Sequence, residues 1–423
     1  MKVGCHAGII TPPIPTAMGG YSARKGPATG VHDDLHVRSL VFESEGERFG
    51  LITCDLLNID RSVAERTREL ASAATGVAPE RIMLAASHTH SGPSTRALMF
   101  GEPPAEYMAW LPLQLASSLL QAVGDLEAAE VAGAVDTVKG LGTNRTDPAL
   151  PHDPTVRLLA ARAGDRLKAV LLNYGCHPTV MGPENLLVSA DWPGAAVAAL
   201  GRALGNPAPW IGFAQGAAGD VSARFVRRAQ SFSEVQRLGS LLAGKSLEML
   251  GNVATFAESG GVGVRRRLLA MEPCALPSRA EADAAVAAAE QRVASLKGAS
   301  HGEQRIAQTA LEGARLALSR IDLQGGLDLT AEVQVARIGR EIAIVGVSAE
   351  LFSALGREIR ERSPFATTLV VGYANGYSGY MPDRAAFARG GYESSSAFTA
   401  PGSGERLVET ALALLSELRA EVA

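Results

Sequence analysis

The sequence lacks several features that would assign it to a specialised class of protein. It has only four cysteines in 423 residues, Cys5, Cys54, Cys176 and Cys274, and no two of them form a CxxC pair. Such wide spacing is unlike a disulfide framework and unlike a thiolate zinc site. No stretch approaches the roughly 20 uninterrupted apolar residues that a membrane span needs. We therefore expect a chain with no disulfide framework and no transmembrane segment.

A strong excess of charge of either sign is also lacking. The net charge is −4, and the two arginine clusters, Arg224 with Arg227 and Arg228, and residues 265–267, are local. Clusters of this size usually belong to a solvated surface, so nucleic acid is not an expected partner. The first residues contain no apolar run typical of a signal peptide, which predicts a cytoplasmic location. The oligomeric state is not specified by any of these features.

The chain instead has abundant material for a large α/β core. Apolar residues make up 47% of the sequence and charged residues 20%, with 45 glycines and 22 prolines for tight turns. Strand-like and helix-like patterns alternate, and we find no internal repeat in the sequence. We predict an α/β or α+β fold, a mixed β-sheet core covered by helices, within a single domain over 1–423. An alanine-rich, charged stretch near 279–323 predicts a helical hairpin insertion. This insertion could be a simple surface hairpin, a lid or a dimerisation arm.

The predicted elements follow from hydrophobic periodicity and turn signals. Two hairpins are predicted, one from strands 36–42 and 48–52 and the other from strands 156–161 and 167–174. Other strands are predicted at 81–86, 210–213, 332–338, 342–347 and 368–372, and helices at 61–74, 106–123, 193–204, 233–250 and 405–422.

A histidine pair follows directly after the predicted strand 81–86. His88 and His90 lie in the run Ser-His-Thr-His-Ser-Gly-Pro, and residues two apart in an extended backbone point to one face. Both could bind a metal, or one could bind it while the other moves protons. Exposed or core-capping histidines would also fit this position.

Three further clusters end predicted strands. His177, flanked by Cys176 and Pro178, follows one of them, and we expect the cysteine to face the core. A small-residue loop, 212–222, ends at Ser222 but contains neither a GxSxG elbow nor a phosphate-binding loop motif. Four of the seven tyrosines, including Tyr380 and Tyr392, fall in a glycine-rich segment near residues 373–392.

In this order, the motifs His-Thr-His-Ser-Gly-Pro, Cys-His-Pro, Gly-Asp-Val-Ser and Asn-x-Tyr-x-x-Tyr resemble the neutral, non-lysosomal ceramidase family. The resemblance runs from about Gly4 to Gly404, and covers the family's catalytic domain without its C-terminal β-sandwich domain. It implies one Zn²⁺ per chain, with four residues matching its ligands: His88, His177, Glu350 and Tyr380. It implies catalytic roles for residues matching His90, Arg145, Tyr392 and Ser222.

The function that this resemblance implies is zinc-dependent hydrolysis of an N-acyl amide bond in a small-molecule or lipid substrate. Ceramide, N-acylsphingosine, would give a fatty acid and a sphingoid base. The sequence departs from the family motif at Ala217, where the family has asparagine, and at Ala223 and Arg224, where the family has Pro-Asn. These changes affect the substrate side of the site more than the metal side. Two alternatives stay open: a metal-independent serine hydrolase that uses Ser222, and a non-catalytic, lipid-binding relative.

Overall fold

The strands form three main sheets in the computed structural model, which describes residues 1–423 except 97–103, 254, 257–259, 300, 323–328 and 423. The first sheet has the order β5(Ile82–Ala86), β4(Glu47–Cys54), β3(His36–Ser44), β1(Lys2–Ile9), β6(Glu127–Ala128). The second has the order β12(Trp210–Gln215), β10(Arg166–Tyr174), β9(Thr155–Ala163), β7(Glu130–Thr137). The third has the order β14(Val262–Ala270), β15(Thr330–Ile338), β16(Ile342–Val347), β18(Thr367–Val371).

One arrangement of elements occurs in all three sheets. An antiparallel hairpin is followed by a helix and then by a strand that pairs in parallel with the second hairpin strand. The three units are β3-β4-α1-β5, β9-β10-α3-β12 and β15-β16-α7-β18, with helices α1(Arg61–Thr75), α3(Asp191–Leu204) and α7(Ser353–Glu361). The topology therefore repeats, although the sequence shows no internal repeat.

Alternation along the strands explains how the sheets pack together. On β3 and β4, Leu40, Phe42 and Leu51 face a central cluster to which all three sheets contribute. Val37 and Val41, on the opposite face of β3, join the cluster that includes α1 and α2(Ala105–Gly124). Strands with both faces apolar are thus buried between a shared core and a helical layer. Burying each such side chain stabilises the fold by roughly 1.5–3 kcal/mol.

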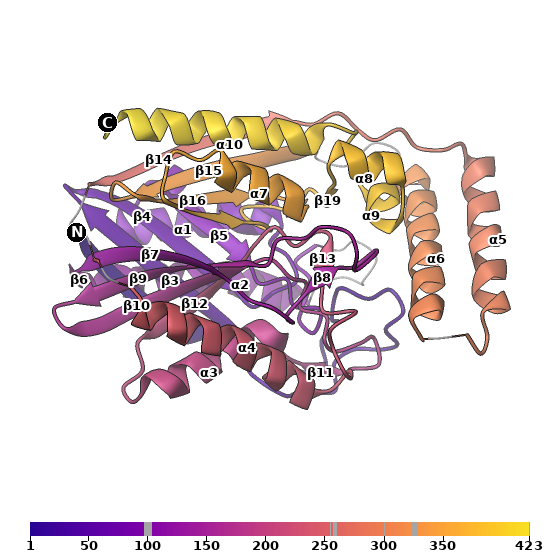
Figure 1. The fold of residues 1–423 in the computed structure, drawn as a ribbon, viewed down its shortest axis with the longest axis horizontal. Coiled ribbons are helices and arrows are strands. Elements are labelled where there is room, and N and C mark those ends of the chain that lie inside the picture. The colour runs from indigo at the N-terminus through magenta and orange to yellow at the C-terminus, as the bar shows by residue number, and fades with distance from the viewer. Residues whose placement is uncertain (97–103, 254, 257–259, 300, 323–328, 423) are drawn as a thin grey trace.

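Helices cover the outer face of each sheet. The second sheet packs on α3 and α4(Phe232–Gly251), and the third on α7 and α10(Ser403–Ala420). Figure 1 shows α7 and α10 on the side of the molecule opposite α3 and α4. Among the described residues, no helix combines the length and the apolar character needed to cross a bilayer.

The α/β class and the predicted helices and strands are confirmed, with ends that shift by a few residues. The mixed β-sheet core consists of three main sheets, because each hairpin starts a separate sheet instead of extending one. The hairpin insertion forms α5(Arg279–Ser295) and α6(His301–Asp322); residue 323 lies outside the described residues. Ser278 and Glu281 make a capping box that starts α5. The hairpin projects from one end of the molecule (Figure 1), where α6 contacts α9(Tyr392–Ser396).

Short elements outside the three main sheets carry three of the predicted site residues, Ser222, Glu350 and Tyr380. They are the two-stranded pairs β2(Gly30–Val31) with β11(Leu187–Val188), β8(Thr143–Asn144) with β13(Val221–Ser222), and β17(Glu350–Leu351) with β19(Tyr380–Met381), together with α8(Arg384–Arg389). A 3-10 turn, Pro79–Arg81, precedes β5. The division into a single domain stays a prediction.

Candidate active site and metal centre

Three of the four predicted metal ligands come from the three repeated units and meet in one buried cluster. His88 follows β5, His177 follows β10, and Glu350 follows β16. The rings of His88 and His177 have centroids 4.7 Å apart, although 89 positions separate them in the chain. Burial is nearly complete for all three side chains. The ends of the three units thus bring together side chains that are remote in sequence.

His88 and His90 do converge, but for a different reason than the predicted extended backbone. The structure gives His88 a φ of 67°, in the left-handed region that non-glycine residues rarely adopt. Its backbone N–H donates to Leu56 O, and its ring stacks on Tyr373 with centroids 4.1 Å apart. The two Nε2 atoms of His88 and His90 lie 3.2 Å apart. A strained backbone at such a position is typical of a functional site.

Backbone carbonyls fix the tautomers of His88 and His177. His88 Nδ1 lies 2.6 Å from Leu57 O, and His177 Nδ1 lies 2.7 Å from Ala218 O. Because a carbonyl oxygen only accepts hydrogen bonds, each Nδ1 carries the proton. In the neutral rings the Nε2 lone pairs therefore point into the cluster. This is the arrangement that outer-shell carbonyls give to metal-binding histidines.

Glu350 brings a carboxylate to the same point. Its Oε2 lies 3.1 Å from His177 Nε2 and 3.5 Å from His88 Nε2. Burial opposes ionisation of Glu350, but the neighbouring imidazoles and Arg145 hold its pKa at about 2. Burial also lowers the pKa of His88 to about 3 and lowers that of His177. A carboxylate and neutral Nε2 atoms therefore face each other, and such acceptor atoms repel unless a cation lies between them.

The donor atoms fit a zinc ion. His88, His90 and His177 each offer a ligand nitrogen, and these three atoms lie within 4.8 Å of one another. With Glu350, they provide imidazole nitrogen and carboxylate oxygen, which are the ligand types of catalytic zinc. His90 is thus placed either as a ligand or beside the ligands. Neither the ligand set nor the catalytic assignments are tested by this geometry, and they stay predictions.

Tyr380 is placed differently from the other predicted ligands. Its ring lies 5.1 Å from the Arg145 guanidinium carbon and 5.7 Å from the ring of Tyr392. The hydroxyls that hydrogen-bond to Glu350 belong to Tyr377 and Tyr373, which the sequence analysis did not single out. Tyr377 lies in the same motif as Tyr380, and Tyr373 lies in the same glycine-rich segment, so only the tertiary structure distinguishes them.

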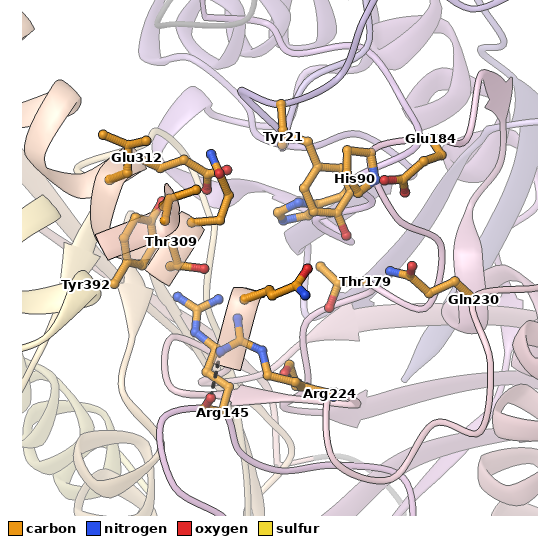
Figure 2. A pocket seen from close by; sticks show the side chains of 18 of the residues that line it. Tyr21, His90, Arg145, Thr179, Glu184, Arg224, Gln230, Thr309, Glu312 and Tyr392 are labelled. Atoms are coloured by element: carbon orange, nitrogen blue, oxygen red, sulfur yellow. Dashed lines mark hydrogen bonds between the residues drawn. The ribbon is translucent and has the colours of Figure 1, made fainter. Parts of the chain in front are cut away.

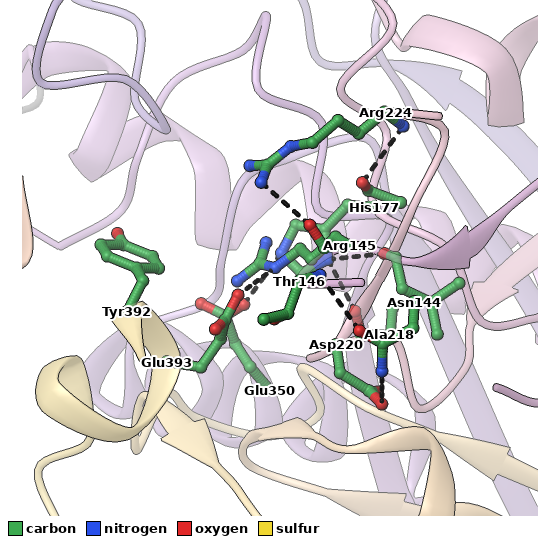
Figure 3. A network of polar contacts seen from close by, with 12 residues as sticks. Asn144, Arg145, Thr146, His177, Ala218, Asp220, Arg224, Glu350, Tyr392 and Glu393 are labelled. Atoms are coloured by element: carbon green, nitrogen blue, oxygen red, sulfur yellow. Dashed lines mark hydrogen bonds and ion pairs between the residues drawn. The ribbon is translucent and has the colours of Figure 1, made fainter. Parts of the chain in front are cut away.

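Arg145, Tyr392 and their neighbours form a second group beside the histidines (Figure 3). Arg145 Nε donates to Glu393 Oε1 at 2.5 Å, and its backbone N–H donates to Asp220 O. Within the described part of the chain, its Nη2 is buried without a hydrogen-bond partner. Burial raises the pKa of Tyr392 to about 12, so its hydroxyl keeps its proton at neutral pH.

A pocket of about 620 Å³ opens beside this cluster (Figure 2). Five of the predicted site residues line it: His90, Arg145, Ser222, Tyr380 and Tyr392. His90 packs its ring edge against Tyr21, with centroids 5.0 Å apart, and its Nδ1 has no hydrogen-bond partner. Two residues that line the pocket, His90 and Arg145, therefore each have a buried polar atom with unused hydrogen-bonding capacity.

Ser222 lies in this pocket but has no base in contact with it. Its Oγ accepts a hydrogen bond from Arg224 N at 3.2 Å. Among the described residues, no imidazole hydrogen-bonds to this hydroxyl. His177, which bridges to Ser222 through the backbone, has its Nδ1 on a carbonyl and its Nε2 beside Glu350. The geometry therefore favours a positioning role for Ser222 over a nucleophilic one.

Gln215, which the sequence analysis did not identify, joins the two histidine loops. Its Nε2 donates to Ser87 O at 2.9 Å and to Cys176 O at 3.0 Å, and its Oε1 accepts from Cys176 N at 3.1 Å. Each bonded residue directly precedes a metal-site histidine. A buried glutamine after an apolar strand gives no local signal of such a role, because the two loops are remote in sequence.

The small-residue loop after β12 serves close packing. A Cβ on Gly219 would lie 2.5 Å from Glu350 O, and one on Gly175 would lie 2.5 Å from Ala217 O. Backbones at this separation leave no space for a side chain. The glycines therefore allow the three loops that carry the site to approach each other. Cys176 is buried, as predicted.

Comparisons with known proteins identify the fold. No protein-family model matches the sequence, and no curated protein matches it. Among solved structures, a neutral ceramidase from Pseudomonas aeruginosa matches with a TM-score of 0.79 and 19% identity, covering 100% of this chain and 75% of the ceramidase chain. A ceramidase complexed with C2 matches with a TM-score of 0.78, 19% identity and the same coverage. The chain therefore has the fold of the solved neutral ceramidases over its whole length.

Proposed function

We propose that this protein is a zinc-dependent hydrolase that cleaves an N-acyl amide bond, with one zinc ion per chain. The observation that carries this proposal is the convergence of the His88 and His177 Nε2 atoms on the Glu350 carboxylate, with both Nδ1 protons held by carbonyls. The fold shared with ceramidases supports amide chemistry at this position. The resemblance to the ceramidase family implies Tyr380 as a fourth zinc ligand.

A zinc ion held by these residues would supply a Lewis acid and an activated water molecule. We assign proton transfer to His90, because its ring lines the pocket and its Nδ1 has no hydrogen-bond partner among the described residues. It can accept a proton from the attacking water and return it to the leaving amine, which is general acid–base catalysis.

In this proposal, Arg145 and Tyr392 stabilise negative charge on the scissile carbonyl oxygen. The partnerless Nη2 of Arg145 is a buried donor, and Glu393 fixes the guanidinium through its Nε. The protonated hydroxyl of Tyr392 is a second donor. Removing one donor of this kind typically reduces kcat by about 10²–10³. Ser222 would then bind a polar group of the substrate.

The first test combines metal analysis with hydrolysis of an amide panel. Purified protein should contain about one zinc per chain, lose amide hydrolysis on chelation and regain it on addition of zinc. His177→Ala should lose zinc and activity together. Activity that persists after complete metal removal would refute the proposal and favour a serine hydrolase, for which Ser222→Ala is the decisive variant.

The role of His90 can be separated in the same experiment. If His90 moves protons, His90→Ala should keep zinc and lose turnover, so that kcat falls with the metal content unchanged. If His90 is the third imidazole ligand, the variant loses zinc as well. A protein that binds zinc but hydrolyses no amide in the panel would support a non-catalytic, lipid-binding relative.

A further inference from the structure

The α5–α6 hairpin forms the outer wall of the pocket that leads to the metal centre. From α5 and the turn after it come Val293, Leu296 and Lys297, and from α6 come Gln304, Gln308 and Thr309. The opposite wall, beside Ser222, contributes Arg145, Arg224 and Arg227. Figure 2 shows the Arg145 and Arg224 side chains on one side of the pocket and Thr309 and Glu312 on another.

The lining offers an extended apolar surface on one wall only. Apart from the tyrosines, its larger apolar side chains, Val293, Leu296 and Leu311, all belong to the hairpin, and most of the other lining residues carry amide, hydroxyl or charged groups. Burying an alkyl chain is favourable only where apolar atoms replace water, at about 0.8 kcal/mol per CH₂. Here such a chain would also desolvate glutamine and arginine side chains, which costs free energy unless they find new partners. The lining is suited to a substrate that has polar groups of its own.

Positive charge dominates the wall next to the reacting groups. Arg224 Nη1 donates to the backbone carbonyl of Arg145 at 2.9 Å, which fixes its guanidinium next to that of Arg145 (Figure 3). The Arg227 guanidinium is tied to Thr179 O in the same lining. A guanidinium held by a carbonyl keeps its full charge, and its planar donors match a carboxylate.

Two of the three glutamates that line the pocket have basic partners. Glu290, on the hairpin wall, forms an ion pair with Arg315 at 2.8 Å. Glu184 interacts electrostatically with Arg24, on the far side of the pocket from Arg145 in Figure 2. Glu312 also lines the pocket and, after burial, is one of the groups that raise the pKa of Tyr392. The positive field is therefore that of the wall with Arg145, Arg224 and Arg227, and this wall attracts an anion.

We propose that the natural substrate is an N-acyl amino acid, an amide whose amine portion carries a carboxylate, and that Arg224 binds this carboxylate. This inference rests on the proposed amide hydrolysis. Water adds across the C–N bond, so that the acyl group leaves as a carboxylic acid and the nitrogen gains a hydrogen to give a free amino acid. Arg224 is a specificity residue, at a position where the sequence departs from the ceramidase motif.

The experiment compares two substrates that differ in the relevant group alone. N-octanoylglycine carries the carboxylate and N-octanoylethanolamine a neutral hydroxyl in its place, while a long-chain ceramide serves as the lipid reference. We expect the zinc-loaded enzyme to have a kcat/KM at least tenfold higher for N-octanoylglycine than for either other substrate. Arg224→Gln should reduce this preference to below threefold, mainly through a higher KM for N-octanoylglycine.

Two further variants make the result interpretable. Arg228→Gln, an exposed arginine that does not line the pocket, should keep the preference. Arg224→Lys retains the positive charge and should keep most of the preference for N-octanoylglycine. This result would exclude misfolding as the cause of the lost preference in Arg224→Gln. A preference for ceramide, or a preference that Arg224→Gln leaves unchanged, would overturn the inference while leaving amide hydrolysis intact. Failure to hydrolyse all three substrates with zinc bound would overturn the proposed function itself.

Discussion

Replacing Gln215 by leucine should loosen both histidine loops at once. The side chain is fully buried, and its amide bonds to Ser87 O, Cys176 O and Cys176 N. Leucine fills a similar volume but leaves these three backbone groups without the partner they have now. An unsatisfied buried group costs about 1–3 kcal/mol. Since the loops can relax in part, we expect the free energy of unfolding to fall by about 3 kcal/mol.

The effect on the metal follows from the positions of the bonded groups. Ser87 directly precedes His88, and Cys176 directly precedes His177, so movement of either carbonyl displaces an imidazole. Loss of such outer-shell contacts typically reduces metal affinity by about 10–100-fold. Urea unfolding of the zinc-free protein gives the loss of stability, and competition with a chelator of known affinity gives the change in zinc binding.

Gln334 offers a matched control for this prediction. It is also fully buried and amide-bonded, to Glu80 O and Asn375, but it contacts neither histidine loop. Gln334→Leu should destabilise the fold with little change in zinc affinity. If Gln215→Leu binds zinc as tightly as the wild type, or weakens binding no more than Gln334→Leu does, the idea that Gln215 clamps the two loops is wrong.

Three other predictions address separate features. Burial raises the pKa of Asp191 from 3.8 to about 6, so the folded state binds the extra proton between these values, and this group lowers stability as pH rises. As the pH rises from 4 to 7, the free energy of unfolding of Asp191→Asn should therefore increase by up to about 3 kcal/mol relative to that of the wild type. Urea unfolding at several pH values measures this, and a difference that does not change with pH would contradict it. Gly219→Ala should cost about 1–3 kcal/mol and weaken zinc binding, because its Cβ would lie 2.5 Å from Glu350 O. Gly244→Ala, which meets nothing within 4 Å in a helix, is the control and should not destabilise the fold. Glu393→Gln weakens the ion pair that orients Arg145, and should reduce kcat at least tenfold with zinc content unchanged; loss of zinc would instead show a structural role.

Local pattern was sufficient for the secondary structure and for the choice of the histidines. The helix 61–74 was predictable from its apolar spacing, and in the structure Asp60 caps its first turn while Gly76 ends it at a φ of 73°. The hairpin insertion was predictable because its composition differs from the rest of the chain. Histidines beside glycine and proline at strand ends indicated a site, and the family resemblance implied Glu350. The cytoplasmic location stays a prediction from the sequence.

Other features depended on contacts between residues far apart in the chain. Pairing of strands into three sheets is not encoded in the period of any one strand, so the repeated topology was not visible in the sequence. The convergence of His88 with His90 depends on a left-handed backbone held by the Leu56 and Leu57 carbonyls, which no local pattern predicts.

By itself, the sequence determined which segments become helices and strands and which residue types are available for chemistry, because periodicity, capping and side-chain chemistry are local properties. Only the tertiary structure decided that Tyr377 contacts Glu350, that Gln215 joins the histidine loops and that Arg224 lines the pocket. The physical reason is that a site assembled from three sheets depends on distances between remote residues, and those distances are fixed by how the sheets pack around their shared core.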